Sequence, residues 1–218
     1  MHRRNITTQQ PLLRGDRVLL RPWRDDDDAD AFAAMNADLR VMELFVAPLS
    51  RTESDAMLAR MRAYITEHGS GWWCVDINGE CAGFTGMSSP PYETPFTPCT
   101  EVGWRFRPQY WGHGYATEAA RLALNYGFKV IQLNEIVSFT TATNHPSRRV
   151  MERLGMRRDV AGDFEHPRAP MGNSPPRPLS SAQNAVENQA ISSYKGSVRN
   201  SAKACCVLIC SNICAARS

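Results

Sequence analysis

The sequence predicts an α/β (α+β) fold, with helices on both faces of one mixed sheet. Three observations carry this prediction: a short strand that runs into a helix, a hairpin in the middle of the chain, and a strand–helix–strand–helix run after it. Alternation of this kind favours a mixed sheet covered on both sides. With 218 residues, of which 43% are hydrophobic, the chain can bury a core without disulfides or metals.

The first elements are a strand and two helices. Residues 17–21 form a short branched run typical of a strand, and the acids at residues 25–28 favour the start of a helix. A second helix is predicted at residues 52–68, where apolar side chains recur at intervals of three and four. Ser50 and Glu53 have the spacing of a capping box, which marks its beginning.

A hairpin and a third strand follow. Residues 72–77 and 80–87 flank Asn78-Gly79, a pair that suits the positive dihedral angles of a two-residue turn. Residues 100–106 are predicted to form the next strand of this set.

The loop at residues 90–98 contains four prolines and is predicted to be stiff, neither strand nor helix. It carries two aromatic residues, Tyr92 and Phe96, which either pack within the loop or contact a substrate.

Two helices and one strand complete the body of the chain. An alanine-rich helix is predicted at residues 117–129, a branched strand at residues 135–141, and a short helix at residues 146–154 that Gly155 closes. Beyond these elements Ser, Asn, Ala and Pro dominate, and hydrophobic periodicity is lost. We therefore expect the following division: an N-terminal extension at 1–11, one domain at 12–168, and an atypical, largely disordered tail at 169–218.

The charge distribution argues against nucleic acid as a partner. Residues 1–168 carry 20 basic and 21 acidic side chains, so the body is neutral, and the excess positive charge lies in the tail. Duplex binding would need Lys and Arg clustered on one face. No signal peptide and no apolar span of membrane length is visible, which favours a cytoplasmic location without membrane contact.

The seven cysteines lack the paired spacing of a disulfide framework or a zinc site. We therefore expect free thiols and no metal.

The glycine turn near residue 112 carries the chemistry. Between the strand that ends at Phe106 and the next helix stands Gln109-x-x-Gly112-x-Gly114, and the small Ala116 follows. Glycines allow backbone amides to turn inward at the spot where the helix N-terminus points, which makes an anion hole. The expected ligand is a pyrophosphate.

Other interpretations of the two glycines fit less well. A dinucleotide-binding turn would need a third glycine where Thr117 stands, and a nucleoside triphosphate loop would need Gly-Lys-Ser/Thr, which is absent. A plain helix-entry turn without a ligand stays open on the glycines alone.

These residues resemble the GCN5-related N-acetyltransferase (GNAT) superfamily, whose acetyl-CoA loop has the pattern Gln/Arg-x-x-Gly-x-Gly/Ala. Gln109, Gly112 and Gly114 match this pattern in full. The resemblance covers residues 12–167, includes Asn144-x-x-Ser147, and looks like the branch of the RimJ/RimL-type ribosomal-protein N-terminal acetyltransferases.

The resemblance implies acetyl transfer from acetyl-CoA, as co-substrate, to a primary amine of a protein N-terminus or a small molecule. It also implies a mostly antiparallel sheet with one splayed parallel pair, residues 100–106 and 135–141, between which the pantetheine arm pairs with exposed backbone. Trp111 and Tyr115 serve most simply as hydrophobic anchors of the turn. The candidate cofactor-binding residues are Trp104, Phe106, Gln109, Gly112, His113, Gly114, Tyr115, Ala116 and Asn144.

For catalysis, the resemblance offers Ser147 as the proton donor to the departing thiolate. Asn144 is a cofactor contact, a helix cap, or both. Glu101 is the first candidate for the base that takes the proton of the amine. Further candidates for the base are Asp163, Glu165 and His166, and ordered water without any single base is the alternative.

The chain departs from the family after residue 168, where a polar segment replaces the expected final strand. The sheet edge there could stay vacant, be filled by residues 204–210, or invite association. The oligomeric state is open, a homodimer included. Two other functions compete with acetyl transfer: a non-catalytic acyl-CoA-binding module with a lost or rebuilt last strand, and a nucleotide-binding protein that uses the same anion hole.

Overall fold

The structure, a computed structural model, describes residues 10–24, 26–90, 93, 97–158, 163–165 and 185–192. The strands in these residues are β1 (Leu13–Arg14), β2 (Leu19–Arg21), β3 (Trp72–Ile77), β4 (Glu80–Ser88), β5 (Glu101–Phe106), β6 (Glu135–Thr141), β7 (Arg157–Arg158), β8 (Phe164–Glu165) and β9 (Ala185–Ser192). The helices are α1 (Asp26–Ala37), α2 (Arg51–His68), α3 (Tyr115–Tyr126) and α4 (His145–Arg153), with a 3-10 turn at Pro108–Tyr110 and a π-helical turn at Gly127–Ile131.

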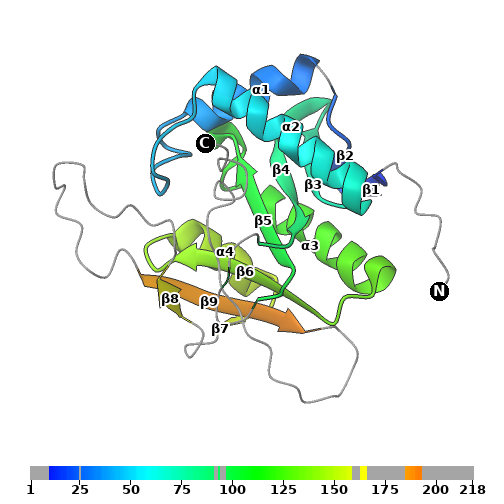
Figure 1. Cartoon of the computed structure of the whole chain (residues 1–218), viewed down its shortest axis with the longest axis vertical. Coiled ribbons are helices and arrows are strands. Elements are labelled where there is room, and N and C mark those ends of the chain that lie inside the picture. Colours follow the sequence, from blue (N-terminus) through cyan, green and yellow to red (C-terminus); the bar gives the residue numbers. More distant parts are fainter. Residues whose placement is uncertain are drawn as a thin grey trace.

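All described strands belong to one sheet in the order β1-β2-β3-β4-β5-β6-β9-β7, with β8 beside β9 (Figure 1). Every pair is antiparallel except β5 with β6, which are parallel and register at one position only, Glu101 opposite Val137. The predicted fold class is therefore confirmed, including the single parallel pair in a mostly antiparallel sheet.

Local sequence signals account for the front half of the fold. Ser50 and Glu53 form the predicted capping box at the start of α2, and Gly69 ends the helix in the left-handed region. Asn78 and Gly79 have φ values of 54° and 89°, which lets them turn β3 directly into β4.

Two hydrophobic layers lie on opposite faces of the sheet. Trp72 packs with the buried faces of α1 and α2, whereas its neighbour Trp73 packs with α3 and Met151 of α4. Successive strand residues point to opposite faces, so β3 is buried on both sides. Figure 1 shows α1 and α2 together, away from α4 and the strands that follow it.

A buried ion network joins β2, α1 and β3. Arg21 donates to Asp28 at 2.6 Å and to Asp76 at 2.7 Å, and all three side chains are buried. Burial alone would raise the pKa of Asp28, but the hydrogen bonds from Arg21 and from the Arg24 N–H outweigh it and leave this pKa below its usual value. Asp28, one of the acids that the sequence predicted to start a helix, therefore also joins that helix to the sheet.

Cys74 and Cys81 lie beside Asp28, close enough for the three side chains to resemble a metal-binding site. The Asp28 carboxylate is already held by Arg21, and burial raises the pKa of the Cys74 thiol far above its usual value. A protonated Cys74 thiol and a neutralised carboxylate are poor metal ligands, so we interpret this group as a polar cluster of the core.

The strand beside β6 was not expected from the sequence, which left this edge of the sheet vacant, filled by residues 204–210, or open to association. Residues 185–192, which were counted in the disordered tail, form β9 and pair with β6 from Glu135 opposite Ser192 to Thr141 opposite Val186. The alternative filler, residues 204–210, lies outside the described residues. The strand was missed because a segment with two branched apolar residues has little pattern of its own, and pairing is decided by the open edge of β6.

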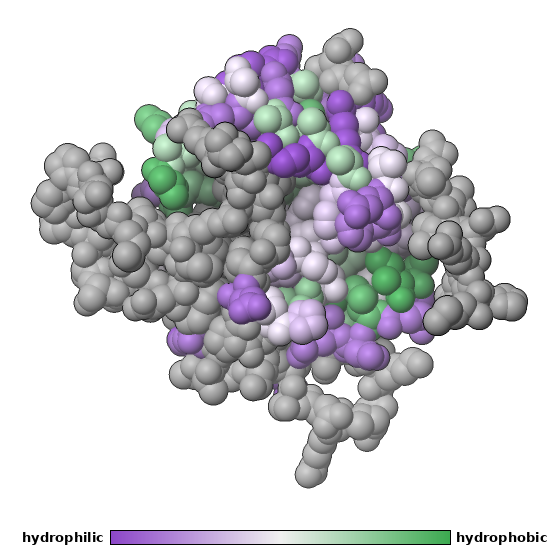
Figure 2. All heavy atoms as spheres, in the orientation of Figure 1, coloured by the Kyte–Doolittle hydropathy of each residue, from purple (hydrophilic) through white to green (hydrophobic). Residues whose placement is uncertain are grey.

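The helix predicted at residues 117–129 needs a smaller correction. It begins two residues earlier, at Tyr115, and ends at Tyr126 before the π-helical turn. That turn exposes Val130 and Ile131 beside the end of α3, where Figure 2 shows a hydrophobic cluster on a mixed surface.

No helix among the described residues has both the length and the apolar character to cross a membrane.

Candidate active site

The glycine turn, residues 107–114, lies between β5 and α3 as the sequence predicted. Gly112 and Gly114 have φ values of 81° and 82°, a conformation that other residues adopt at a cost. Trp111 fastens the turn to the strand, because its indole Nε1 donates to the carbonyl of Phe106 at 2.8 Å. Gly114 caps α3 without a side chain, which leaves the helix N-terminus open.

Unpaired donors gather where α3 begins. Among the described residues, the main-chain N–H groups of residues 112–117 have no hydrogen-bond acceptor, and the first paired amide is that of Glu118, which donates to the Gly114 carbonyl at 3.1 Å. The Thr117 hydroxyl is also unpaired although this residue is only 8% exposed. Free amides at a helix N-terminus bind anions, and a buried hydroxyl without a partner indicates a contact that a ligand or water completes.

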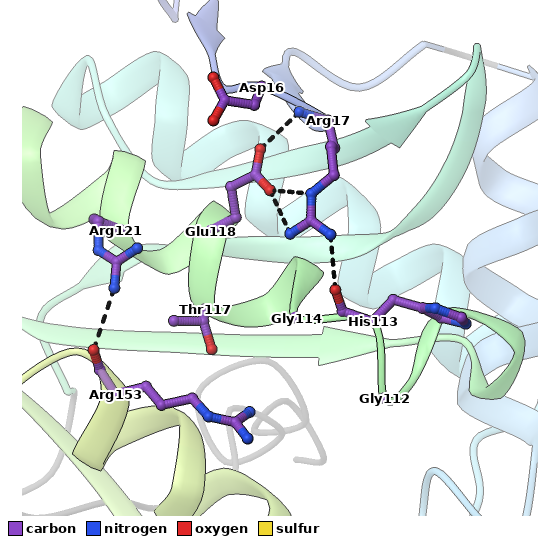
Figure 3. Close-up of a pocket in the computed structure, with 9 residues that line it drawn as sticks. All are labelled: Asp16, Arg17, Gly112, His113, Gly114, Thr117, Glu118, Arg121 and Arg153. Atoms are coloured by element: carbon purple, nitrogen blue, oxygen red, sulfur yellow. Dashed lines mark hydrogen bonds and ion pairs between the residues drawn. The ribbon is translucent and has the colours of Figure 1, made fainter.

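These donors line a cavity of about 490 Å³ (Figure 3). Gly112, His113 and Gly114 form one side, and Thr117, on the first turn of α3, lies next to them. Three of the predicted cofactor-binding residues therefore share one cavity.

Arg17 braces this turn from the other end of the chain. Its guanidinium donates to the His113 carbonyl at 2.9 Å and to Glu118 at 2.8 Å, while its main-chain N–H also donates to Glu118, at 2.7 Å. Burial would raise the pKa of Glu118, but the hydrogen bonds from Arg17 outweigh it and lower that pKa. Glu118 therefore stays ionised and neutralises the Arg17 charge.

Arg121 and Arg153 line the far side of the same cavity. Arg121 lies on α3, and Arg153 is the last residue of α4. An Arg121 Nη donates to the Arg153 carbonyl at 3.2 Å, and neither guanidinium forms an ion pair with another described residue. In Figure 3 the Arg153 side chain extends beneath Thr117, on the side to which the threonine oxygen points.

The remaining predicted residues of the turn make internal contacts. The Gln109 side-chain oxygen accepts from Arg107 Nε at 3.2 Å and Nη2 at 2.9 Å when the amide is oriented to satisfy both. The Arg17 guanidinium lies 5.0 Å from the centre of the Tyr115 ring, and Ala116 packs against the core. Tyr115 thus acts as an anchor of the turn.

The open edge of β5 presents main-chain groups towards β6. The Thr100 carbonyl accepts from the Val137 N–H at 2.8 Å. The main-chain groups of Thr100, and of every second residue after it, therefore point towards β6. By this alternation the main-chain groups of Trp104 and the N–H of Phe106 face β6, yet no described ladder pair uses them. They are available to a ligand in extended conformation.

Glu101 begins β5 and is buried, with 3% of its surface exposed. Burial raises the pKa of its carboxyl group well above the usual value, and no described residue pairs with it. A second cavity of about 260 Å³ lies at this end of the strand pair, and Cys99 and Glu135 are among its lining residues. Burial first, then the charges of Glu101 and Glu135, raise the pKa of Cys99 to about 12.

Asn144 and Ser147 lie at the start of α4, at the opposite end of that helix from Arg153. Asn144 caps the helix, because its side-chain oxygen accepts from the Ser147 N–H at 3.2 Å. The predicted capping role is confirmed, and the Ser147 hydroxyl is not used by the cap. Neither residue lines the cavity of the glycine turn. Along the axis of α4, Asn144 lies about 14 Å and Ser147 about 9 Å from Arg153, which does line it.

The later candidates for the base are dispersed. Asp163 is held at 2.6 Å by Arg158, and the backbone of Glu165 belongs to β8 beside β9. His166 and the two loop aromatics, Tyr92 and Phe96, lie outside the described residues.

Six residues of the cavity were not expected from the sequence: Asp16, Arg17, Thr117, Glu118, Arg121 and Arg153. Thr117 had been considered only as a missing glycine, and the positions of Arg17, Arg121 and Arg153 depend on how distant elements meet. The spacing Thr117-x-x-x-Arg121 was the one available signal, since it places both side chains on one helix face.

Comparison with known proteins agrees with this geometry. The family model of the acetyltransferase (GNAT) domain matches residues 17–157. The FsC-acetyl coenzyme A-N(2)-transacetylase of Aspergillus fumigatus is 30% identical over 154 residues, which cover 67% of this chain and 65% of that protein. The uncharacterized N-acetyltransferase YnaD of Bacillus subtilis is 49% identical over 59 residues, which cover 27% of this chain and 35% of YnaD.

The chain thus spans less than two thirds of the length of both relatives. Among solved structures, the ribosomal L7/L12 alpha-N-protein acetyltransferase RimL in complex with coenzyme A superimposes with a TM-score of 0.65 at 12% identity, covering 84% of this chain and 98% of RimL. The family match, with an open glycine turn at the start of α3, shows that the chain belongs to the GNAT acetyltransferases, enzymes that take acetyl-CoA as co-substrate.

Proposed function

We propose that this protein transfers the acetyl group of acetyl-CoA to a primary amine. The observation that carries the proposal is the set of unpaired donors at the glycine turn, the N–H groups of residues 112–117 together with the buried Thr117 hydroxyl. Six amides and a hydroxyl at a helix N-terminus match the charge and the many acceptor oxygens of a pyrophosphate.

With the pyrophosphate there, the pantetheine arm runs back along the open edge of β5. The main-chain groups of Trp104 and Phe106 would pair with its amides as a neighbouring strand would. This placement directs the thioester towards the single point where β5 and β6 join, near Glu101.

The reaction forms a carbon–nitrogen bond and breaks a carbon–sulfur bond. The neutral amine attacks the thioester carbonyl, an N–H of β5 stabilises the oxyanion of the tetrahedral intermediate, and the thiolate leaves. Ser147 gives a proton to the thiolate, and Glu101 takes one from the amine. Holding both substrates in one geometry supplies much of the rate.

The environment of Glu101 supports its role as the base. A carboxylate with the usual pKa is too weak a base to take a proton efficiently from an amine, and burial raises the pKa of this one. Bringing the pKa closer to the operating pH improves a general base.

The proposal leaves open which class of amine accepts the acetyl group. The Aspergillus relative is named an FsC-acetyl coenzyme A-N(2)-transacetylase, and RimL is named a ribosomal L7/L12 alpha-N-protein acetyltransferase. We expect action in the cytoplasm, because Cys74 and Cys81 lie side by side in the core as free thiols.

Release of free CoA thiol from acetyl-CoA tests the proposal. The full chain is assayed over a panel of N-terminal peptides, polyamines and amino-group metabolites, with a colorimetric thiol reagent as the readout. Amine-dependent release that obeys saturation kinetics supports an acetyltransferase. Tight binding of acetyl-CoA without release over the whole panel indicates the alternative, a non-catalytic acyl-CoA-binding module.

A further inference from the structure

The cavity at the glycine turn is longer than a pyrophosphate requires. Its lining runs from Gly112 past Thr117 to Arg121, which lies one helical turn further along α3. Four residues of an α-helix advance about 6 Å, so Arg121 lies clearly beyond the helix N-terminus. Arg153 reaches the same region from α4.

The two arginines differ from Arg17, the third arginine of the cavity. Arg17 is neutralised by Glu118 at 2.8 Å. Arg121 donates only to a carbonyl among the described residues, and the Arg153 guanidinium has no partner among them. Asp16 also lines the cavity, but no ion pair joins its carboxylate to either arginine among the described residues. Two positive charges without a carboxylate partner therefore face the end of the cavity beyond the glycine turn.

An independent observation points to a ligand contact between these regions. The Thr117 hydroxyl is buried, lines the cavity and has no partner. It stands between the free amides of the turn and the two arginines, and Figure 3 shows its oxygen directed to the side along which Arg153 extends. A ligand that contacts the amides, this hydroxyl and the guanidiniums must carry anionic groups at two separate places.

We propose that Arg121 and Arg153 bind the 3′-phosphate of CoA and thereby select acetyl-CoA over its 3′-dephospho form. This inference rests on the proposed function, which places the pyrophosphate at the glycine turn. In CoA the ribose follows the pyrophosphate and carries the third phosphate, so a second anionic group lies one sugar ring away from the first. Guanidinium groups suit a terminal phosphate because their N–H groups form paired hydrogen bonds with its oxygens.

Calorimetric titration of the full chain with CoA and with 3′-dephospho-CoA tests the assignment. The wild type is expected to bind CoA about tenfold more tightly than dephospho-CoA. Arg121→Gln and Arg153→Gln should each reduce this ratio, and the double variant should bring it near one by weakening CoA alone. Arg149→Gln is the matched control, because this exposed arginine lies one turn before Arg153 on α4 and does not line the cavity.

Each outcome separates the inference from the function on which it rests. Two results overturn the inference but leave CoA binding in place. One is equal affinity of the wild type for CoA and dephospho-CoA. The other is a ratio of these affinities that is the same in the wild type, in both arginine variants and in the Arg149→Gln control. A parallel loss of affinity for both ligands in the arginine variants also overturns it, since the arginines would then contact the pyrophosphate. If neither ligand binds to the wild type, the proposed function fails as well. Thermal melting of each variant confirms that it is folded.

Discussion

The Arg17 guanidinium donates a 2.9 Å hydrogen bond to the main-chain carbonyl of His113, 96 residues later in the chain. His113 stands between the two glycines with positive φ, where the backbone has the greatest freedom. One bond to its carbonyl therefore restricts the orientation of the amides on either side. The front of the chain therefore stabilises the glycine turn from a distant position in the sequence.

Replacing Arg17 by methionine should weaken acetyl-CoA binding about three- to tenfold, with little change in kcat. The change removes the bond to His113 and leaves Glu118, an uncompensated negative charge, at the rim of the cavity. Because half of the Arg17 side chain is exposed, solvent screens the interaction and keeps the effect modest. Titration calorimetry measures the dissociation constant, and Arg14→Met, on an exposed residue of β1, is the control. Unchanged affinity in Arg17→Met would show that the turn needs no brace.

Gly114→Ala and Gly79→Ala form a matched pair for the turn conformation. Both glycines have positive φ, 82° and 89°, so alanine should cost about 1–2 kcal/mol of stability at either position. A Cβ at Gly79 would meet nothing within 4 Å, and one at Gly114 would come no closer than 3.5 Å to Arg17 Nη2. Both variants should melt at lower temperature, but only Gly114→Ala should lose affinity for acetyl-CoA. An equal affinity in the two variants counts against an anion site at the turn.

The parts of the fold that sequence predicts well are those that neighbouring residues decide. Asn78 and Gly79 turn the hairpin whatever packs around them, and Ser50 and Glu53 cap α2 by contacting each other. The strand β9 was missed because its pairing depends on the edge of β6, about fifty residues away in the chain. A pattern that is weak within the segment cannot reveal a partner outside it.

The candidate site divides in the same way. The glycine spacing predicted the open turn, because positive φ and free amides are local properties of Gly112 and Gly114, and the binding of an anion there stays a prediction. Arg17 and Arg153 were not predicted, since long side chains from separate elements reach the cavity only after the sheet and α4 are assembled. Asn144 was predicted as a cap, a role within one helical turn, and its contact with the cofactor stays a prediction.

Glu101→Gln should become increasingly more stable than the wild type as pH rises. Folding raises the pKa of Glu101 above the ordinary glutamate value of 4.5, so the folded state holds the proton more tightly than the unfolded state. That stabilisation is complete below pH 4.5 and is lost as pH rises through the raised pKa, whereas glutamine has no proton to lose. Melting temperatures measured from pH 4 upwards test the sign, and a constant difference at every pH would contradict the raised pKa.

The same variant tests the base. If Glu101 takes the proton of the amine, kcat/KM of the wild type should rise as pH passes through its raised pKa, and Glu101→Gln should be slower by about a hundredfold or more without that rise. Glu43→Gln, on an exposed loop residue, is the control. Full activity in Glu101→Gln would favour ordered water as the proton acceptor.

Ser147→Ala and Asn144→Ala separate catalysis from helix capping. The cap uses the Ser147 N–H and the Asn144 oxygen, so Ser147→Ala should keep its stability while kcat falls about tenfold or more. Asn144→Ala should lose about 1 kcal/mol of stability, and Asn144→Asp should restore the cap. Steady-state kinetics and thermal melts distinguish the two effects. A Ser147→Ala enzyme with normal kcat would remove Ser147 as the proton donor.

Titration calorimetry with acetyl-CoA and with S-acetylpantetheine tests most directly that the glycine turn holds the CoA pyrophosphate. Both ligands carry the thioester and the pantetheine arm, but only acetyl-CoA can reach the amides of residues 112–117 and the Thr117 hydroxyl. We expect one acetyl-CoA per chain, bound about a hundredfold more tightly than S-acetylpantetheine, a difference of about 2.7 kcal/mol. Equal affinity for the two ligands, or no binding of acetyl-CoA, would contradict the assignment.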